Sequence, residues 1–579
     1  MLSALLFLPP ELLNIIAEAL DAADVKRLRL SCKQLGASLE AMVLHTISFN
    51  INARNVCSES GIPKLQYLAT KRYSGPSRMA KHLVIDCLAP EYDPNFEAES
   101  YINGEWVANV PLKDQPQGVV ARKQMKLYLF YALKSLKKIR SVSWKINQYD
   151  EEWVQRAVMN ALESLQSLRS VRIELDWARI PLPLHRLRNI HDITIIDSKP
   201  STDSGNAYEI YRNLGKMISR SPRLIGIDIQ RGDYDSAHAD ISASLHQLFW
   251  CYPTSRVPLR LNRLVMGRMF VKLDRLTLPH FHHLKSLDLS HMLEPYHMPN
   301  INPEYTYDGP FSSPCTQLHA SQNLVGSSID DIWLALTDLS VELEVIKVRK
   351  VTMGLLSYLE TYCGVKKLHA LSSSSSTTPA ECDELASRFF GTSLGRHAQT
   401  IDALDIEAVN DGLWCFGSHN MTVIASCTNL LSLGITMSSL LLKASLCDAE
   451  PTLGSEPPLQ VDKFDPITSL YDTISSHLVK LRTLKISVPT NIDRFEGYWC
   501  GYSVSQHFSW VCDTVAERLC VSSINKPSSL PGGLPAVVIG EKSCKEKQLE
   551  PFPTAHSVIA VDAEARTPPQ TRLCYREVC

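Results

Sequence analysis

The sequence predicts an α/β protein in which short buried strands alternate with helices, preceded by a small helical unit. The chain has 579 residues, which is more than one compact core normally holds. Its hydrophobic fraction of 45% and charged fraction of 21% are typical of a chain that folds. A spacing of three aliphatic residues, L-x-x-L-x-L, recurs along the body, often after an amphipathic helical stretch.

Three short helices are expected within the first fifty residues. Pro9 and Pro10 suit the first turn of a helix that runs to about Leu20. The apolar stripe of this helix is expected at Leu12, Ile16, Ala19 and Leu20. A unit of this size buries too little surface to be stable alone, so it should pack on a neighbour.

Two capping signals predict where the next helices begin. Asp24 is the expected N-cap of the second helix. Ser31 and Gln34 have the S-x-x-Q spacing of a capping box at the start of the third. The apolar positions of these two helices are Val25, Leu28, Cys32, Leu35, Leu39 and Met42.

Residues 8–47 resemble an F-box. The resemblance rests on Leu8-Pro9-Pro10-Glu11-Leu12, Ile15-Ile16, Leu20-Asp21, Leu28-Arg29-Leu30 and Cys32-Lys33. The chain departs from the pattern at Leu35, where many members carry an aromatic residue.

The resemblance implies docking on the S-phase-kinase-associated adaptor of cullin-RING ubiquitin ligases, and through it on the cullin scaffold. The motif positions that would contact the adaptor are Leu8, Pro9, Leu12, Ile15, Leu28 and Leu30. The alternative is that these residues are ordinary core of an N-terminal helical cap.

The aliphatic pattern of the body predicts a series of strands. Its central residues are Val142, Val171, Ile193, Ile227, Leu287, Ile346, Leu368, Leu404, Leu433 and Leu484, with Leu264 as a further candidate. Several intervals between them lie near the roughly 20 to 29 residues of a leucine-rich repeat. The body resembles the degenerate repeats of F-box receptors, especially fungal ones, which implies an irregular leucine-rich-repeat solenoid, or horseshoe. An unrelated α/β domain is the alternative.

Residues that alternate with the aliphatic ones should line the concave surface of such a horseshoe. They are Lys145, Arg172, Glu174, Asp228, Gln230, Asp288, Lys347, Arg349, His369, Asp405 and Lys485. A surface of mixed sign suits recognition of a protein better than recognition of a polyanion. The alternative for each residue is a solvated sheet face.

The expected organisation is an F-box-like domain over 1–50, a repeat domain over 51–520 and a disordered tail over 523–579. Pro-, Ser- or Glu-rich insertions interrupt the repeats at about 89–117, 291–322, 372–378 and 449–465.

Net charge and cysteine content indicate which classes of partner and which cellular compartment to expect. The formal net charge of −2 favours neither nucleic acid nor an anionic membrane as a partner. The 16 cysteines form no C-x-x-C pair, which favours reduced thiols in a cytoplasmic or nuclear protein. Neither a signal peptide nor a membrane span is expected.

Motifs for covalent chemistry or for a cofactor have little support, so we expect no enzymatic activity and no cofactor or metal. Gly391-Thr392-Ser393-Leu394-Gly395 fits G-x-S-x-G, but a helix rather than a strand should precede Ser393. The histidines at 280, 282, 283 and 291 are expected to be surface or core residues.

The sequence thus predicts a substrate-recognition subunit of an SCF-type ubiquitin ligase, with an unidentified protein as its target. The first alternative is a repeat scaffold that binds partners without a ubiquitin ligase role. A serine hydrolase built on Ser393 is the remaining alternative.

Overall fold

The computed structural model divides the chain into two compact units. Unit 1 comprises Met1–His283 with Met292–Ser327, and unit 2 comprises Leu284–His291 with Ser328–Cys579. The structure describes residues 8–58, 61–71, 75–93, 99–102, 105–108, 116–176, 178–197, 204–232, 244–294, 326–371, 378–446, 464–489, 504–525, 535–540, 542–548 and 573–578. The boundary between the units falls inside the 51–520 span that the sequence predicts as one repeat domain.

Unit 1 begins with three short helices, α2 (Pro10–Glu18), α3 (Ala22–Ser31) and α4 (Lys33–Val43). The prediction of Asp24 as an N-cap is wrong, because Asp21 caps α3 and accepts a hydrogen bond from the Asp24 backbone N–H at 2.8 Å. The predicted capping box at Ser31 is also wrong. Ser31 ends α3 and donates to the Leu28 carbonyl at 2.7 Å, and Cys32 is the N-cap of α4.

The three helices enclose a small core of their own. Ala17, Val25 and Leu39 are buried together, with Leu28 and Met42 packed against them. The predicted stripe of the first helix is wrong by about one residue: Leu13 and Ala17 face inward, whereas Leu12 and Leu20 are exposed. The helix therefore has apolar side chains both on its core face and on its solvent face.

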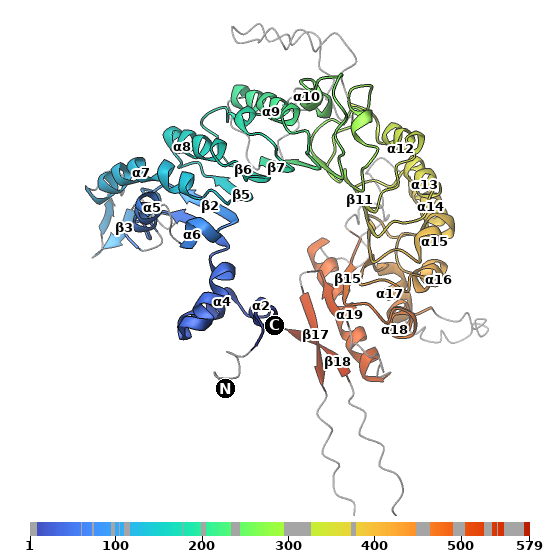
Figure 1. Cartoon of the computed structure of the whole chain (residues 1–579). Coiled ribbons are helices and arrows are strands. Elements are labelled where there is room, and N and C mark those ends of the chain that lie inside the picture. Colours follow the sequence, from blue (N-terminus) through green and yellow to red (C-terminus); the bar gives the residue numbers. More distant parts are fainter. Residues whose placement is uncertain are drawn as a thin grey trace, which may run out of the picture. The chain divides into compact units, whose positions relative to one another are not determined.

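A parallel sheet forms the rest of unit 1. Its strands pair in the order β1 (Thr46–Ile51), β2 (His82–Leu88), β5 (Ser141–Ile146), β6 (Ser170–Leu175), β7 (Asp192–Asp197), β8 (Gly226–Arg231) and β9 (Arg263–Gly267). Helical segments connect them: α5 (Ile62–Thr70), α6 (Gly75–Met79), α7 (Pro116–Ser135), α8 (Glu152–Glu163), η2 (Leu184–Arg186), α9 (Ser204–Ser219), α10 (Leu245–Phe249) and η4 (Leu278–His280). Helices α7, α8 and α9 follow one another along one face of the strands (Figure 1).

Unit 2 repeats this arrangement. Its strands pair in the order β10 (Ser286–Asp288), β11 (Val345–Val348), β12 (Lys367–Leu371), β13 (Ala403–Glu407), β14 (Ser432–Thr436), β15 (Thr483–Ser487) and β16 (Ala536–Ile539), all parallel. The antiparallel strands β17 (Lys542–Gln548) and β18 (Leu573–Val578) follow.

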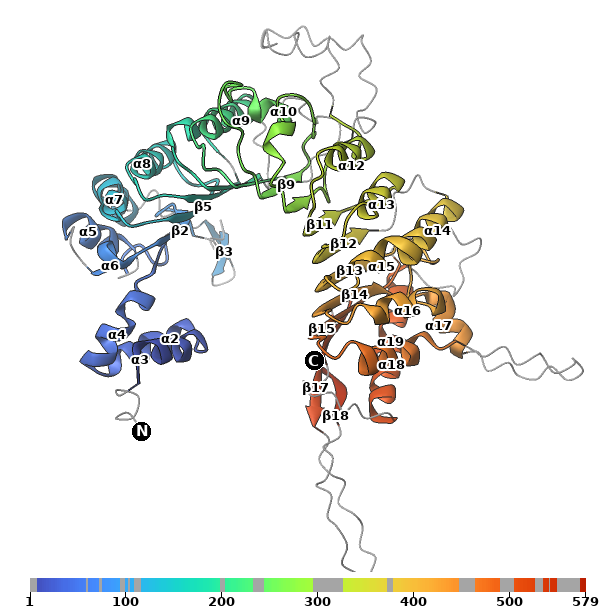
Figure 2. The same cartoon turned by 45° about the vertical axis from the view of Figure 1, so that its right-hand side comes forward.

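Helices cover one face of the strands of unit 2. They are α12 (Ile329–Asp338), α13 (Met353–Leu359), α14 (Pro379–Arg388), η6 (Phe389–Ser393), α15 (Leu394–His397), α16 (Ser418–Ser426), α17 (Ser439–Leu446), α18 (Pro466–His477) and α19 (Val504–Asn525). Figure 2 shows α12 to α16 in succession beside β11 to β15. Full capping boxes, Ser328 with Asp331 and Thr378 with Glu381, fix the starts of α12 and α14.

The predicted strands are confirmed. Every central residue of the aliphatic pattern, including Leu264, lies in a strand and is buried. The pattern works because a strand places alternate side chains on the core face, where the connecting helix covers them. The α/β class with a parallel sheet and alternating helices is therefore correct.

Two segments differ from the expected loops and tail. Within 89–117, β3 (Glu99–Ile102) and β4 (Glu105–Ala108) pair as an antiparallel hairpin. Within 523–579, β16 continues the parallel sheet and β17 and β18 pair with it, so these stretches are not disordered. The strands β3, β4, β17 and β18 lack the L-x-x-L-x-L spacing, whereas β16 has it at Leu534-x-x-Val537-x-Ile539, a match that was not recognised from the sequence. Residues 295–325, 372–377 and 447–463, which hold most of the other predicted insertions, lie outside the described residues.

Among the described residues, the helices are too short or too polar to cross a membrane.

One buried histidine should make stability depend on pH. His280 accepts a hydrogen bond from the Leu259 N–H at 2.8 Å and stacks on Phe249, and burial lowers its pKa to about 4. The unfolded chain binds a proton at this site below about pH 6.5, whereas the folded chain does so only near pH 4. The His280 contribution to stability is therefore lost as pH falls from about 6.5 to 4, by an amount of roughly 3 kcal/mol.

We predict that His280→Asn flattens this dependence, because an amide oxygen can accept the same hydrogen bond but does not titrate. The variant should be less stable at pH 7 by about 1–2 kcal/mol through lost ring packing. Urea unfolding at pH 7 and pH 4.5 measures how much stability each protein loses on acidification. Other titrating groups, such as Asp150, are present in both proteins, so the difference between the two losses reports on His280. An equal loss in both proteins on acidification would contradict the assignment.

Candidate functional site

The N-terminal helices expose large apolar side chains to solvent. On α2, Leu12 is 45% exposed and Ile15 is 61% exposed, and on α3, Leu30 is 81% exposed. Pro9, which precedes α2, is also exposed. Other side chains already fill the core of the three N-terminal helices, so these residues do not contribute to it. An exposed apolar group of this kind suits a protein contact.

The residues expected to contact the adaptor differ in their exposure to solvent. Pro9, Leu12, Ile15 and Leu30 are exposed, and Leu8 is half-buried. Leu28 differs, because it is half-buried and packs against the Ala17–Val25–Leu39 cluster. The expectation that Leu28 belongs to the contact surface therefore does not fit its position in the core.

In unit 2, the alternating positions of the strands form a polar row across the sheet. The strand register places Asp288 beside Lys347, Lys347 beside His369, His369 beside Asp405, Asp405 beside Gly434 and Gly434 beside Lys485. All of these except Gly434 were predicted to line the concave surface. The structure brings them together because parallel strands in register place equivalent positions side by side.

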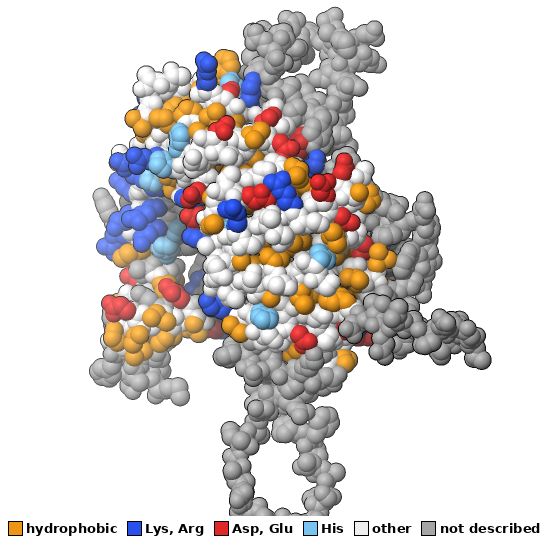
Figure 3. Space-filling model, turned by 90° about the vertical axis from the view of Figure 1, so that its right-hand side faces the viewer, with side chains coloured by type: hydrophobic (Ala, Val, Ile, Leu, Met, Phe, Trp, Pro, Cys, Tyr) orange, Lys and Arg blue, Asp and Glu red, His pale blue; other side chains and the backbone are white. Residues whose placement is uncertain are grey.

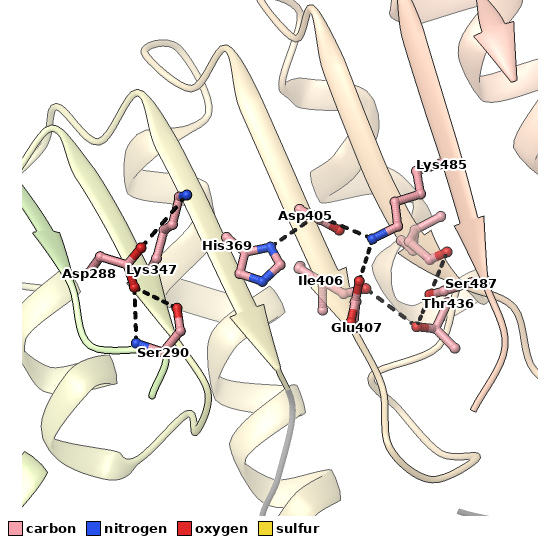
Figure 4. Close-up of polar contacts among 11 residues, drawn as sticks. Asp288, Ser290, Lys347, His369, Asp405, Ile406, Glu407, Thr436, Lys485 and Ser487 are labelled. Carbon is pink, nitrogen blue, oxygen red and sulfur yellow. Dashed lines mark hydrogen bonds and ion pairs between the residues drawn. The ribbon is translucent and has the colours of Figure 1, made fainter. Parts of the chain in front are cut away.

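Side-chain contacts join the members of this row (Figure 4). Lys347 Nζ lies 3.7 Å from Asp288 Oδ2. His369 Nδ1 lies 2.9 Å from Asp405 Oδ2, and Lys485 Nζ lies 3.8 Å from the same oxygen. Lys485 also pairs with Glu407, the next outward residue of β13. Asp405 is thus held between a histidine on β12 and a lysine on β15.

The charges in this row reinforce one another. The hydrogen bond to Asp405 raises the pKa of His369, against the opposing effect of burial. Burial would raise the pKa of the Asp405 carboxyl, but the His369 hydrogen bond and the charge of Lys485 hold it below its ordinary value. Burial also acts against the ammonium of Lys485, and Glu407 and Asp405 outweigh it and raise its pKa. The row is therefore an ordered, partly exposed ion-pair network of mixed sign.

Gly434 leaves the space that Asp405 occupies. A Cβ atom added at Gly434 would lie 2.7 Å from Asp405 Cγ, closer than real Cβ contacts allow. Beyond it, the hydroxyl of the fully buried Thr436 lies 2.7 Å from that of Ser487 and links β14 to β15. The glycine is needed for the close approach of the carboxylate rather than for its backbone angles.

The predicted surface residues of unit 1 pair mostly within or beside their own strands. Arg172 binds Glu174 on the same strand, with 2.9 Å between Nη2 and Oε1, and Lys145 Nζ lies 3.9 Å from Asp176. Asp228 is only 7% exposed, which is less than expected, because Arg263 and Gln230 both bind it at 2.9 Å.

Two further observations bear on the sequence interpretation. Arg349 is exposed directly after β11, outside the strand. Glu407 was not predicted, although the alternation along β13 continues one step past Asp405 to reach it. Extending each strand by two residues would have identified it from sequence.

The G-x-S-x-G segment does not have the geometry of a nucleophile turn. Phe389–Ser393 is a π-helical turn between α14 and α15, with no strand before the serine. Ser393 is 0% exposed and donates to Glu360 Oε1 at 3.0 Å, and Glu360 also binds Arg388. Ser393 and Arg388 therefore connect their helical segments to Glu360, which follows α13.

The described residues also hold no group of three or more His, Cys, Asp or Glu side chains that could bind a metal ion.

No model of a known protein family matches the chain, and no curated protein matches it.

We predict that Asp405→Asn lowers the pKa of His369 toward its ordinary value, because the neutral amide no longer stabilises the imidazolium. A raised histidine pKa contributes stability that is complete below about pH 6.5 and is lost as pH rises through the folded-state pKa. The variant should therefore lose more stability at pH 6 than at pH 8. Histidine-selective NMR titration and urea unfolding measure the two effects. Asp288→Asn, which alters the same row without touching His369, is the control, and an equal effect of both variants would contradict the pairing.

We further predict that Gly434→Ala disrupts the row. The new methyl group must displace the Asp405 carboxylate or the strand, at a cost of roughly 1–3 kcal/mol. Gly395→Ala is the matched control, because an added Cβ there meets no atom within 4 Å, and it should be neutral or slightly stabilising. Thermal unfolding compares the two, and equal midpoints would exclude the close contact at Gly434.

Proposed function

We propose that the protein is a substrate receptor of an SCF-type ubiquitin ligase. The N-terminal helices dock on the S-phase-kinase-associated adaptor, and the strand face of the repeats binds a target protein. The resemblance of residues 8–47 to an F-box is the starting point, and the repeats are of the degenerate leucine-rich type. The protein itself is non-catalytic in this proposal, which also places it in the cytoplasm or nucleus.

The observation that carries the proposal is the solvent exposure of the motif residues. Leu12, Ile15 and Leu30 match the F-box pattern, and all three point away from the core that Leu13, Ala17 and Leu39 fill. A helical cap would bury such residues against the repeats, whereas an adaptor-binding unit needs them free. Burial of a leucine or isoleucine at an interface is worth about 1.5–3 kcal/mol per side chain, so a few such residues can anchor a complex.

The polar row of unit 2 supports a protein as the target. Its members are of both signs and are joined by ion pairs between neighbouring strands, so the surface has an ordered charge pattern. Such patterns favour one partner over others by electrostatic complementarity. A target held there would present its lysines near the ubiquitin-conjugating enzyme, and proximity makes the transfer effectively intramolecular.

The second candidate is a repeat scaffold without a ubiquitin ligase role. The ordered polar row favours it as much as it favours the receptor, because either protein would bind a partner there. Adaptor binding distinguishes the two.

The test is adaptor binding by the intact chain and by a Leu12→Ala, Ile15→Ala variant, measured by isothermal titration calorimetry. The variant removes exposed apolar anchors and should weaken binding at least tenfold, while its stability changes by less than about 0.5 kcal/mol. Leu334→Ala, an exposed leucine on α12 in unit 2, is the matched control and should bind like the intact chain. Absence of binding by the intact chain would exclude the receptor and leave the scaffold.

A further inference from the structure

One edge of the unit 1 sheet, at the N-terminal ends of its strands, carries a row of basic residues. The backbone N–H of each residue that precedes a strand bonds to the carbonyl of its neighbour: Lys81 to His45 at 2.8 Å, Arg140 to Lys81 at 2.7 Å, Arg169 to Arg140 at 2.7 Å and His191 to Arg169 at 2.6 Å. These bonds hold the five residues, here called the basic edge, at equivalent positions. Neighbouring positions are separated by the interstrand spacing of about 4.8 Å.

The equivalent positions in unit 2 carry charges of both signs. There the row reads Lys285, Glu344, Lys366, Asp402, Leu431 and Arg482, with the same backbone bonds. Glu344 pairs with both neighbouring lysines, at 3.7 Å to Lys285 and 2.7 Å to Lys366. The fold therefore accommodates an alternating, self-neutralising row, and like charges on the basic edge are not a requirement of the architecture.

The carboxylates of the described residues form no ion pair with Lys81, Arg140 or Arg169. Arg169 instead donates to the carbonyl oxygens of Gln166 and Leu168. Burial lowers the pKa of His45, and the nearby His82 and Lys81 lower it further. Like charges in adjacent strands repel one another, so the row is unfavourable without an anionic partner.

A cavity adjoins the basic edge. Its volume is about 1220 Å³, and it lies between the N-terminal helices and the starts of the first strands. Lys26, Arg78, Lys137 and Lys138 line it together with Lys81 and Arg140, and the acidic residue among its lining is Glu18. Apolar side chains complete the wall: Ala17, Leu20, Val25, Met42, Val43 and Met79.

Lys and Arg side chains are unevenly distributed in the view of Figure 3. The surface facing the viewer carries both signs, whereas Lys and Arg gather densely beside histidines at the left of the view. A chain with a net charge of −2 therefore has strongly positive local regions.

We propose that the basic edge and the adjoining cavity bind an acidic polypeptide segment whose anionic side chains alternate with apolar ones. The anionic groups contact the cations, and the apolar groups lie against the accessible part of the wall, formed by residues such as Leu20 and Met79. The anions are carboxylates or phosphates, which share this chemistry.

The composition of the cavity favours a peptide over a nucleic acid. Proteins that bind single strands stack the bases on aromatic side chains, and the cavity lining contains no Phe, Tyr or Trp. Its apolar wall is aliphatic, which suits Leu or Val side chains of a peptide. A duplex would contact cations but would leave this wall uncovered.

This inference goes beyond the proposed receptor function, which uses the exposed face of α2 and α3 and the strand face of unit 2. Because adaptor binding can be measured on the same variants, failure of one proposal is distinguishable from failure of the other.

The experiment measures fluorescence anisotropy of a labelled peptide in which Leu alternates with Asp and Glu, added to the full chain. A peptide with Asn and Gln in place of the acids is the neutral control, and one with phosphoserine separates phosphate from carboxylate recognition. Binding of the acidic peptide should weaken roughly tenfold in Arg140→Glu, Arg169→Glu and should fall with added salt. Arg482→Glu, at the equivalent position in unit 2, is the matched control and should bind as the unaltered chain does.

The outcomes decide the proposal. Loss of binding confined to the basic-edge variant, with unaltered circular dichroism and adaptor binding, supports it for the anion that binds more tightly. Absence of binding by both the acidic peptide and its phosphoserine form, equal binding of the neutral peptide, or equal loss in Arg482→Glu would overturn it. Tighter binding of a single-stranded oligonucleotide that is lost in the same variant would also overturn it, in favour of nucleic acid.

Discussion

The architecture depends on the alternation of buried aliphatic and outward polar side chains along parallel strands. At each repeat, residues such as Leu404 and Ile406 enter the core, and a helix from the same repeat covers them. Parallel strands need such a crossover, and the helices can lie on one face only if the opposite positions tolerate water. The polar character of Asp405 and Glu407 follows from this constraint, and so does the availability of one sheet face for binding.

Register turns this alternation into surface chemistry. Side chains far apart in the sequence, such as His369 and Lys485, meet at one carboxylate because each occupies the same position of its own repeat. The same rule applies one step earlier, before the strands begin, where unit 1 places Arg140 beside Arg169 and unit 2 places Lys366 beside Glu344. One scaffold thus holds either a neutral or a charged row, and the difference lies only in which residue fills the position.

The N-terminal helices follow a different principle. Three short segments share a small core around Ala17, Val25 and Leu39, and several of their large apolar side chains have no place inside it. The surplus on α2 and α3 stays at the surface, where it has value only in a complex. Exposed apolar side chains and the folding core therefore lie on two faces of the same helix, with Leu12 on one and Leu13 on the other.

Sequence alone was enough to predict the α/β class, the position of the strands and most of the polar row, because period-two alternation is a local property that spacing reveals. It did not determine which side chains pair, since Asp405 meets His369 and Lys485 only through register, nor the caps of α3 and α4, where neighbouring polar residues compete. Net charge concealed the basic edge, because a sum over the chain carries no information on position. Only the tertiary structure placed those cations in adjacent strands, buried Asp228 and Ser393, and gave β16 to β18 their pairing partners.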